Sequence, residues 1–194
     1  MSGATVPFLR RRPPHKPTPS AEVSSAPALA LHQPEPGPES TLRTLPRVRG
    51  AGRLEPHAPM VVLDRRQSSI GSLRVLVDPA PDWAGVLWEL ADGRSGPLDD
   101  VPLDDGRRPY VSRGSAGTAT SYDVGLRHLR AFRRIIIGVP STSVISIELV
   151  GGTRIVCAPG TTALALYQHD GELYLRADSE PYPSQGHLRA EYGM

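Results

Sequence analysis

The sequence predicts an all-β protein, an antiparallel β-sandwich that follows a disordered, proline-rich N-terminal tail. Three observations lead to this fold class. From about residue 70 onward, short runs of alternating apolar and polar residues recur roughly every ten residues. Turn pairs such as Asp-Gly and Gly-Gly separate several of these runs, and little helical periodicity lies between them.

Residues 1–59 are expected to form the tail and residues 60–194 the folded domain. Twelve of the 21 prolines lie in the first 60 residues, and residues 1–59 carry a net charge of +4 against −2 for the rest. A segment rich in proline and poor in aromatic residues buries too little apolar surface to offset the entropy lost on ordering. The basic run from Arg10 to Arg12 could contact nucleic acid or an anionic membrane, but we favour a solvated tail without a specific partner.

The first predicted strands cover residues 73–77 and 85–91, and the second ends in the turn pair Asp92-Gly93. A polar connection rich in glycine and aspartate is expected over residues 94–108. Residues 133–139 form a short apolar run that ends before a proline, which is typical of a strand buried on both faces.

The remaining strands are predicted as two hairpins. Residues 144–150 and 153–158 flank a Gly-Gly pair, which suits a two-residue turn. Residues 163–178 form two alternating runs around Asp170-Gly171, a pair that tolerates the positive φ angles of tight hairpin turns. Helical turns are expected near residues 124–132 and 185–192.

The sequence shows no arrangement of residues that predicts catalysis. The HExxH, GxSxG and phosphate-loop motifs are all missing, and the glycine-rich run 113–121 lacks the lysine of a phosphate loop and is interpreted as a flexible loop. Cys157 stands in an apolar strand, where a small buried hydrophobic residue is expected. We therefore predict that the protein is not an enzyme, uses no cofactor and has no small-molecule substrate.

The acidic run over residues 97–106 is the best metal candidate by composition. Calcium takes six to eight oxygen ligands, and four aspartates could supply several of them. The run lacks the alternating aspartate order of a calcium loop, so we interpret it as a solvated loop. The aspartates are Asp99, Asp100, Asp104 and Asp105.

Several motifs, in order, resemble the TerD family of tellurium-resistance and stress-response proteins. They are GVLWELADGRSG, the pair Pro109-Tyr110, HLRAFRRIIIGV, ALALYQHDGELYLRAD and LRAEYG, and together they span about residues 71–193. The resemblance implies a sandwich of two antiparallel sheets without enzymatic activity. It also implies calcium binding through acidic loops, and a role as a binding or scaffold module in membrane-associated stress complexes.

The calcium ligands that the resemblance implies are mostly replaced in this chain. Before the LWEL strand the family shows a DLDLG-like run, whereas this chain has Pro81 and Trp83 at the aspartate positions, and Asp82 falls out of register. The second acidic loop is replaced around Arg113, and Asp123 is the only remnant of a later glutamate. Since each lost carboxylate weakens the hold on a divalent cation, we predict a degenerate site without tight calcium binding.

Two classes of function follow. In the first, the domain is an adaptor with protein partners in a stress-response complex, and the tail is a tether. In the second, the tail binds an anionic partner, either nucleic acid or a membrane surface, and the sandwich supports it. Trp83 and Tyr182 are candidate partner contacts, or they cap the core. The single cysteine excludes an intrachain disulfide and favours the cytoplasm, with membrane association through partners.

Overall fold

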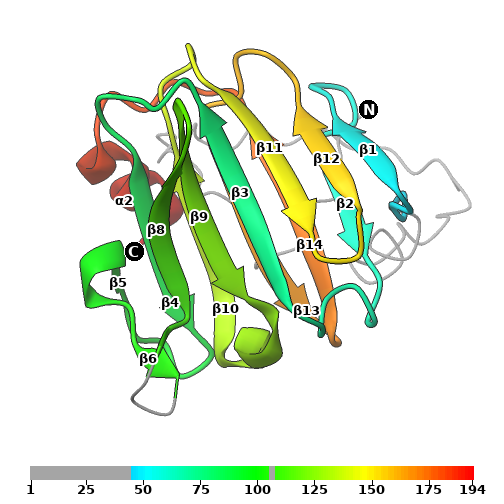
Figure 1. The fold of residues 1–194 in the computed structure, drawn as a ribbon. Coiled ribbons are helices and arrows are strands. Elements are labelled where there is room, and N and C mark those ends of the chain that lie inside the picture. Colours follow the sequence, from blue (N-terminus) through cyan, green and yellow to red (C-terminus); the bar gives the residue numbers. More distant parts are fainter. Residues whose placement is uncertain (1–44, 105–107) are drawn as a thin grey trace, which may run out of the picture. The chain divides into compact units, whose positions relative to one another are not determined.

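Alternating apolar side chains give the chain two six-stranded sheets that stack face to face (Figure 1). The computed structural model describes residues 45–104 and 108–194, and the features below belong to these residues. Sheet I has the order β1 (Ala51–Leu54), β12 (Arg154–Cys157), β11 (Val144–Leu149), β3 (Ser72–Asp78), β9 (Ala119–Gly125) and β8 (Val111–Ala116). Sheet II has the order β2 (Met60–Leu63), β14 (Glu172–Asp178), β13 (Ala163–His169), β10 (Phe132–Gly138), β4 (Gly85–Leu90) and β5 (Ser95–Pro97).

Neighbouring strands are antiparallel throughout both sheets except for β1, which pairs with β12 in parallel. Short elements join or cover the sheets: η2 (Leu98–Asp100), β6 (Leu103–Asp104), β7 (Arg108–Pro109), η3 (Leu126–Ala131) and α2 (Gln185–Tyr192). The predicted all-β sandwich is confirmed, and so are the two helical segments, the first of which is a 3-10 helix.

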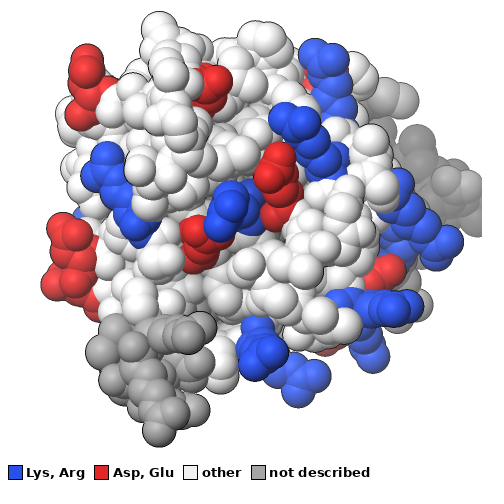
Figure 2. All heavy atoms as spheres, viewed as in Figure 1, with Lys and Arg blue, Asp and Glu red and all other residues white. Residues whose placement is uncertain are grey.

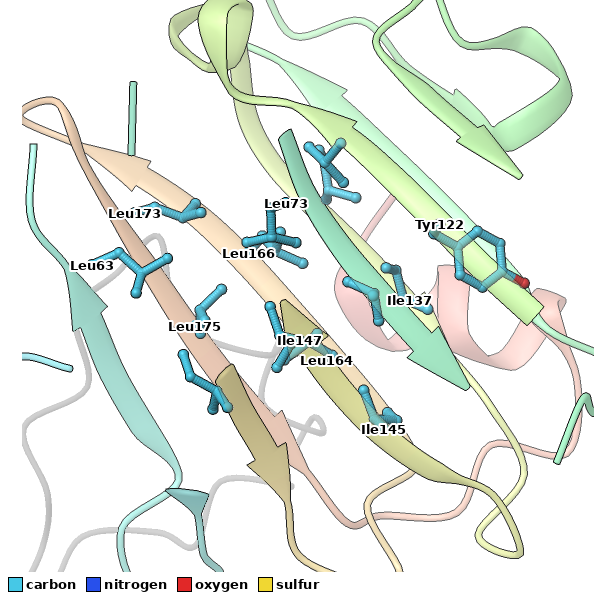
Figure 3. Packing of buried hydrophobic residues seen from close by; sticks show 14 of the residues in the cluster. Leu63, Leu73, Tyr122, Ile137, Ile145, Ile147, Leu164, Leu166, Leu173 and Leu175 are labelled. Atoms are coloured by element: carbon cyan, nitrogen blue, oxygen red, sulfur yellow. The ribbon is translucent and has the colours of Figure 1, made fainter. Parts of the chain in front are cut away.

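The core lies between the sheets, where most strands contribute every second side chain (Figure 3). Ile145 and Ile147 of sheet I and Leu164 and Leu166 of sheet II are at most 1% exposed. Each such side chain contributes about 1.5–3 kcal/mol when it is removed from water. Burial of these aliphatic pairs therefore holds the two sheets together.

The outer face of sheet I carries a row of alternating charges, which crosses four neighbouring strands in register (Figure 2). The row runs Arg154, Glu148, Arg74 and Asp123. Arg74 Nε lies 2.8 Å from the Asp123 carboxylate, and Arg154 Nε lies 3.7 Å from Glu148. Opposite charges on adjacent strands favour this register.

The outer face of sheet II is covered at one side by α2. Ser184 caps the helix by accepting a hydrogen bond from the His187 amide, and Gly193 ends it in the left-handed conformation. Leu188 and Tyr192 are buried, as the i, i+4 spacing predicts. Leu188 seats against Gly138 of β10, where an added Cβ would lie 2.6 Å from Leu188 Cδ2.

The predicted start of the folded domain at residue 60 is wrong. Strand β1 pairs with β12, and Val62 donates to the Pro46 carbonyl, so residues 45–59 belong to the sandwich. Only a few apolar side chains, such as Val48 and Leu54, anchor this segment. Its composition therefore resembles that of the proline-rich tail, and the sequence showed no sign of a strand there. The rest of the predicted tail, residues 1–44, lies outside the described residues.

Three connections also differ from the prediction. Residues 113–121, expected to be a flexible loop, belong to the hairpin β8–β9, because Gly117 supplies a positive φ at the turn. The expected polar connection 94–108 contains β5, η2 and β6. The link between β11 and β12 is longer than the two residues predicted. The Leu149 amide donates to the Thr153 carbonyl across it, and Gly152, one of the three residues between them, takes the left-handed conformation.

Candidate functional site

The segment 64–71, which joins β2 to β3, is held rigidly at one end of the sandwich. The backbone amide of Gln67 donates to Asp64 Oδ1 at 2.9 Å, and the backbone amide of Asp64 donates to Gln67 Oε1 at 3.2 Å. The Gln67 side chain also donates to the Val48 carbonyl and to Thr153 Oγ1. Ser68 ties the segment to sheet II, because its hydroxyl donates to Leu63 O and accepts from the Leu173 amide. These bonds fix the backbone and leave the neighbouring side chains pointing outward.

A cleft of about 420 Å³ opens beside this segment. Its walls come from segment 64–71, from η3 and from the turn between β13 and β14. The polar side chains that line it are Arg65, Ser68, Ser69, Arg127, Arg130, Gln168 and Asp170. Leu126 and Leu129, both buried, form the apolar part of the wall and anchor η3 to the core.

Positive charge dominates the cleft. Arg65, Arg127 and Arg130 are exposed, and none of them forms a salt bridge within residues 45–104 and 108–194. Asp170 is the one acidic residue among the lining side chains. Three guanidinium groups present forks of N–H donors that match the oxygens of a phosphate or carboxylate. The cleft is therefore suited to hold an anion.

A second, smaller hollow lies on the other side of the same segment. It has a volume of about 330 Å³ and is lined by Arg66, Gln67, Ile70, Leu149, Val150, Gly151 and Thr153. Ile70 and Val150 are 60% and 72% exposed. We call the two hollows and the segments around them (64–71, 125–131, 149–153 and 168–171) the basic end of the domain. Figure 2 shows arginine side chains along its lower edge.

The opposite end of the sandwich has the opposite charge. The loops there, residues 55–59, 78–84, 117–118, 139–143, 158–162 and 178–184, contain no lysine or arginine. Their acidic residues are Glu55, Asp78, Asp82, Asp178 and Glu180. The described domain therefore has a charge asymmetry along its strands, which turns the basic end toward any anionic partner.

The structure does not bring the candidate calcium ligands together. Asp82 is exposed between β3 and β4, and Asp99 and Asp100 are exposed on η2. No group of three or more His, Cys, Asp or Glu side chains with metal-site geometry occurs in the described part of the chain. Asp104 lies on β6, and Asp105 lies outside the described residues. The absence of tight calcium binding remains a prediction.

Asp123, the remnant of the family's acidic position, has a different partner. Its carboxylate accepts from Arg74 Nε at 2.8 Å and from Arg74 Nη2 at 3.4 Å, as part of the charged row on sheet I. This contact raises the pKa of Arg74 through the hydrogen bond and the charge of Asp123. The carboxylate is thereby neutralised by a cation of the protein.

The other residues singled out in the sequence have structural positions. Burial raises the pKa of the Cys157 thiol to about 12, so the thiolate that a nucleophile requires does not form near neutral pH. Tyr182 is buried, and its ring centroid lies 6.3 Å from that of Tyr192 on α2, so it packs against the helix and is not a surface contact. Trp83 is half-buried, and Arg113 is exposed on β8. The run from Arg10 to Arg12 lies outside the described residues.

Sequence reasoning missed the four arginines of the basic end. Arg65 and Arg66 follow Asp64 at the end of the buried strand β2, where polar residues indicate an end of the sheet. Arg127 and Arg130 stand three residues apart, a spacing that places both on one side of a 3-10 helix. What the sequence could not provide is the pairing of β3 with β9, which places Ser72 opposite Gly125 and so brings these two segments to the same cleft.

No helix among the described residues is long and apolar enough to cross a membrane. Comparison of the chain with protein-family models, with curated proteins and with solved structures finds no match.

Proposed function

We propose that this protein is a non-catalytic binding module, and that the arginine cleft at its basic end holds the phosphate group of an anionic ligand. One observation carries the proposal: Arg65, Arg127 and Arg130 surround one cleft without a salt bridge among the described residues. Arg74 and Arg134 elsewhere in the domain, by contrast, each pair with a carboxylate. Guanidinium groups left unpaired around a rigid hollow are typical of anion recognition.

The hydroxyls of the cleft support binding and not catalysis. The Ser68 hydroxyl already donates to Leu63 O and accepts from the Leu173 amide, and the Ser69 hydroxyl donates to the Arg65 carbonyl at 2.6 Å. A nucleophilic serine needs a base within hydrogen-bond reach, and neither hydroxyl has one among its partners. The cleft therefore offers charge and shape, which suffices for an adaptor.

We also propose a TerD-type role, with protein partners in a stress-response complex and a cytoplasmic location. The order of the five sequence motifs supports this assignment, and a two-sheet sandwich is the fold class that the resemblance implies. Fold alone does not carry function, so the arginine cleft is the feature to test.

The test is titration of the full-length protein with inorganic pyrophosphate by isothermal calorimetry at low salt. The variant Arg127→Ala/Arg130→Ala should lower the affinity about tenfold or more, because hydrogen bonds to charged groups contribute roughly 1.5–3 kcal/mol each. The matched control is Arg113→Ala, which removes an exposed arginine of β8 that lines neither hollow. Equal binding by all three proteins, or no binding by the wild type, would contradict the proposal.

A further inference from the structure

The basic end combines charge with exposed aliphatic side chains. Among the described residues, three large apolar side chains are prominently exposed: Ile70, Val144 and Val150. Val144 pairs with Asp78 at the acidic end, whereas Ile70 and Val150 both line the smaller hollow of the basic end. The two most exposed apolar side chains therefore stand on the same end as the unpaired arginines.

Ile70 and Val150 belong to segments that touch each other. A Cβ added to Gly71 would lie 2.9 Å from Val150 Cγ2, so the chain immediately after Ile70 packs against the turn that carries Val150. The hydrogen bonds from the Gln67 side chain to the Val48 carbonyl and to Thr153 Oγ1 hold these two segments in place. The pair is thus a fixed apolar tip, with Arg66 in the same hollow and Arg65 in the adjoining one.

We propose that the basic end docks on an anionic lipid bilayer, with Ile70 and Val150 inserted among the headgroups and the arginines on lipid phosphates. The inference rests on the proposed function, since the phosphate in the cleft would be that of a lipid. Basic side chains are attracted to the negative potential of an anionic leaflet, and aliphatic tips gain by leaving water for the acyl boundary. Neither the electrostatic attraction nor the insertion of two aliphatic side chains gives stable membrane binding alone, but the two together do.

The charge asymmetry gives the docking its orientation. The acidic loops lie at the far end of the strands, so the domain stands with the start of β3 and the end of β11 at the membrane. The chemistry of the tip favours a bilayer over nucleic acid. Single-stranded nucleic acids stack their bases on aromatic side chains. Both exposed tips here are aliphatic, and Tyr122, the nearest described tyrosine in sequence to η3, is buried.

The experiment is co-sedimentation of the full-length protein with vesicles of phosphatidylcholine alone and of phosphatidylcholine mixed with phosphatidylserine. Wild type should bind the mixed vesicles, bind the neutral ones far more weakly, and lose binding as salt rises. The variant Ile70→Asn/Val150→Asn should lower the affinity for mixed vesicles about tenfold, since insertion scales with the apolar area buried. The control Val144→Asn removes an exposed valine at the acidic end and should bind as wild type does.

Pyrophosphate titration of the same proteins separates the two proposals. Ile70→Asn/Val150→Asn should keep wild-type pyrophosphate affinity, and Arg127→Ala/Arg130→Ala should lose both ligands. Pyrophosphate binding without vesicle binding would overturn the membrane inference and leave the arginine cleft standing. Equal vesicle binding by wild type and by Ile70→Asn/Val150→Asn would also overturn it. The binding would then come from another part of the chain, such as residues 1–44, which both proteins contain. Failure of wild type with both ligands would overturn the proposed function itself.

Discussion

Glu89 of β4 accepts a 2.5 Å hydrogen bond from Arg134 Nε of β10, its direct partner across sheet II. The two side chains are only 10% and 12% exposed. A register shift between Phe132 and Arg134 places Arg133 within reach as well, and its guanidinium donates to the other oxygen of Glu89 at 2.9 Å. One carboxylate thus balances two arginines on the outer face of the sheet.

Replacing Glu89 with alanine should destabilise the fold strongly. The change leaves Arg134 buried without a counter-charge, and breaking such a pair from one side typically costs about 3–5 kcal/mol. Urea unfolding followed by circular dichroism would measure the loss in the free energy of unfolding. Arg133→Ala is the matched control, because that arginine is 55% exposed and its pair should contribute under about 1 kcal/mol. Equal losses in the free energy of unfolding in both variants would show that the buried pair of Glu89 and Arg134 stabilises the fold no more than the exposed one does.

The sequence predicts the interior of this fold better than its edges. Strands β3, β4, β10, β13 and β14 were expected within a residue or two, because alternation and turn pairs such as Asp170-Gly171 are local signals; both residues of that pair have positive φ, as predicted. Of the strands in the two large sheets, β1, β2, β5, β8 and β9 were missed. Four of these are edge strands that are short or exposed, and the position of β1 depends on pairing with the distant β12. Strand β9 lies inside sheet I, but its residues were interpreted as part of a flexible loop and of a helical turn.

Cys157 should be nearly unreactive in the folded protein. Because burial raises the pKa of its thiol to about 12, labelling by a thiol reagent at pH 7–9 should be slow and should accelerate only on addition of denaturant. The raised pKa also affects stability: the unfolded thiol ionises from about pH 9, so its contribution is complete below that pH and declines as the pH rises toward 12. Rapid labelling of the native protein at pH 7 would show that β12 opens readily.

Calcium should not bind tightly to the full-length protein. Asp123 is held by Arg74, and Asp82 lies in a different loop from Asp99 and Asp100, so the described carboxylates share no site. Calorimetric titration should show no binding tighter than roughly 10 μM, the weak limit of calcium sensor sites. The variant Arg74→Ala offers a control, because it frees Asp123 without adding a ligand. Tight binding by wild type would mean that residues beyond the described ones complete a site.

The packing of α2 on sheet II can be tested through Gly138 and Leu188. A methyl group at residue 138 would lie 2.6 Å from Leu188 Cδ2, and Leu188 is fully buried and has little room to move. Gly138→Ala should therefore cost about 1–3 kcal/mol through overpacking, and Leu188→Ala about 2–5 kcal/mol through lost burial. In the double variant the new methyl occupies part of the space that Leu188 leaves, so the combined loss should be smaller than the sum of the single losses. Free energies of unfolding for the four proteins give this coupling directly. Strict additivity would mean that the helix does not rest on Gly138 in solution.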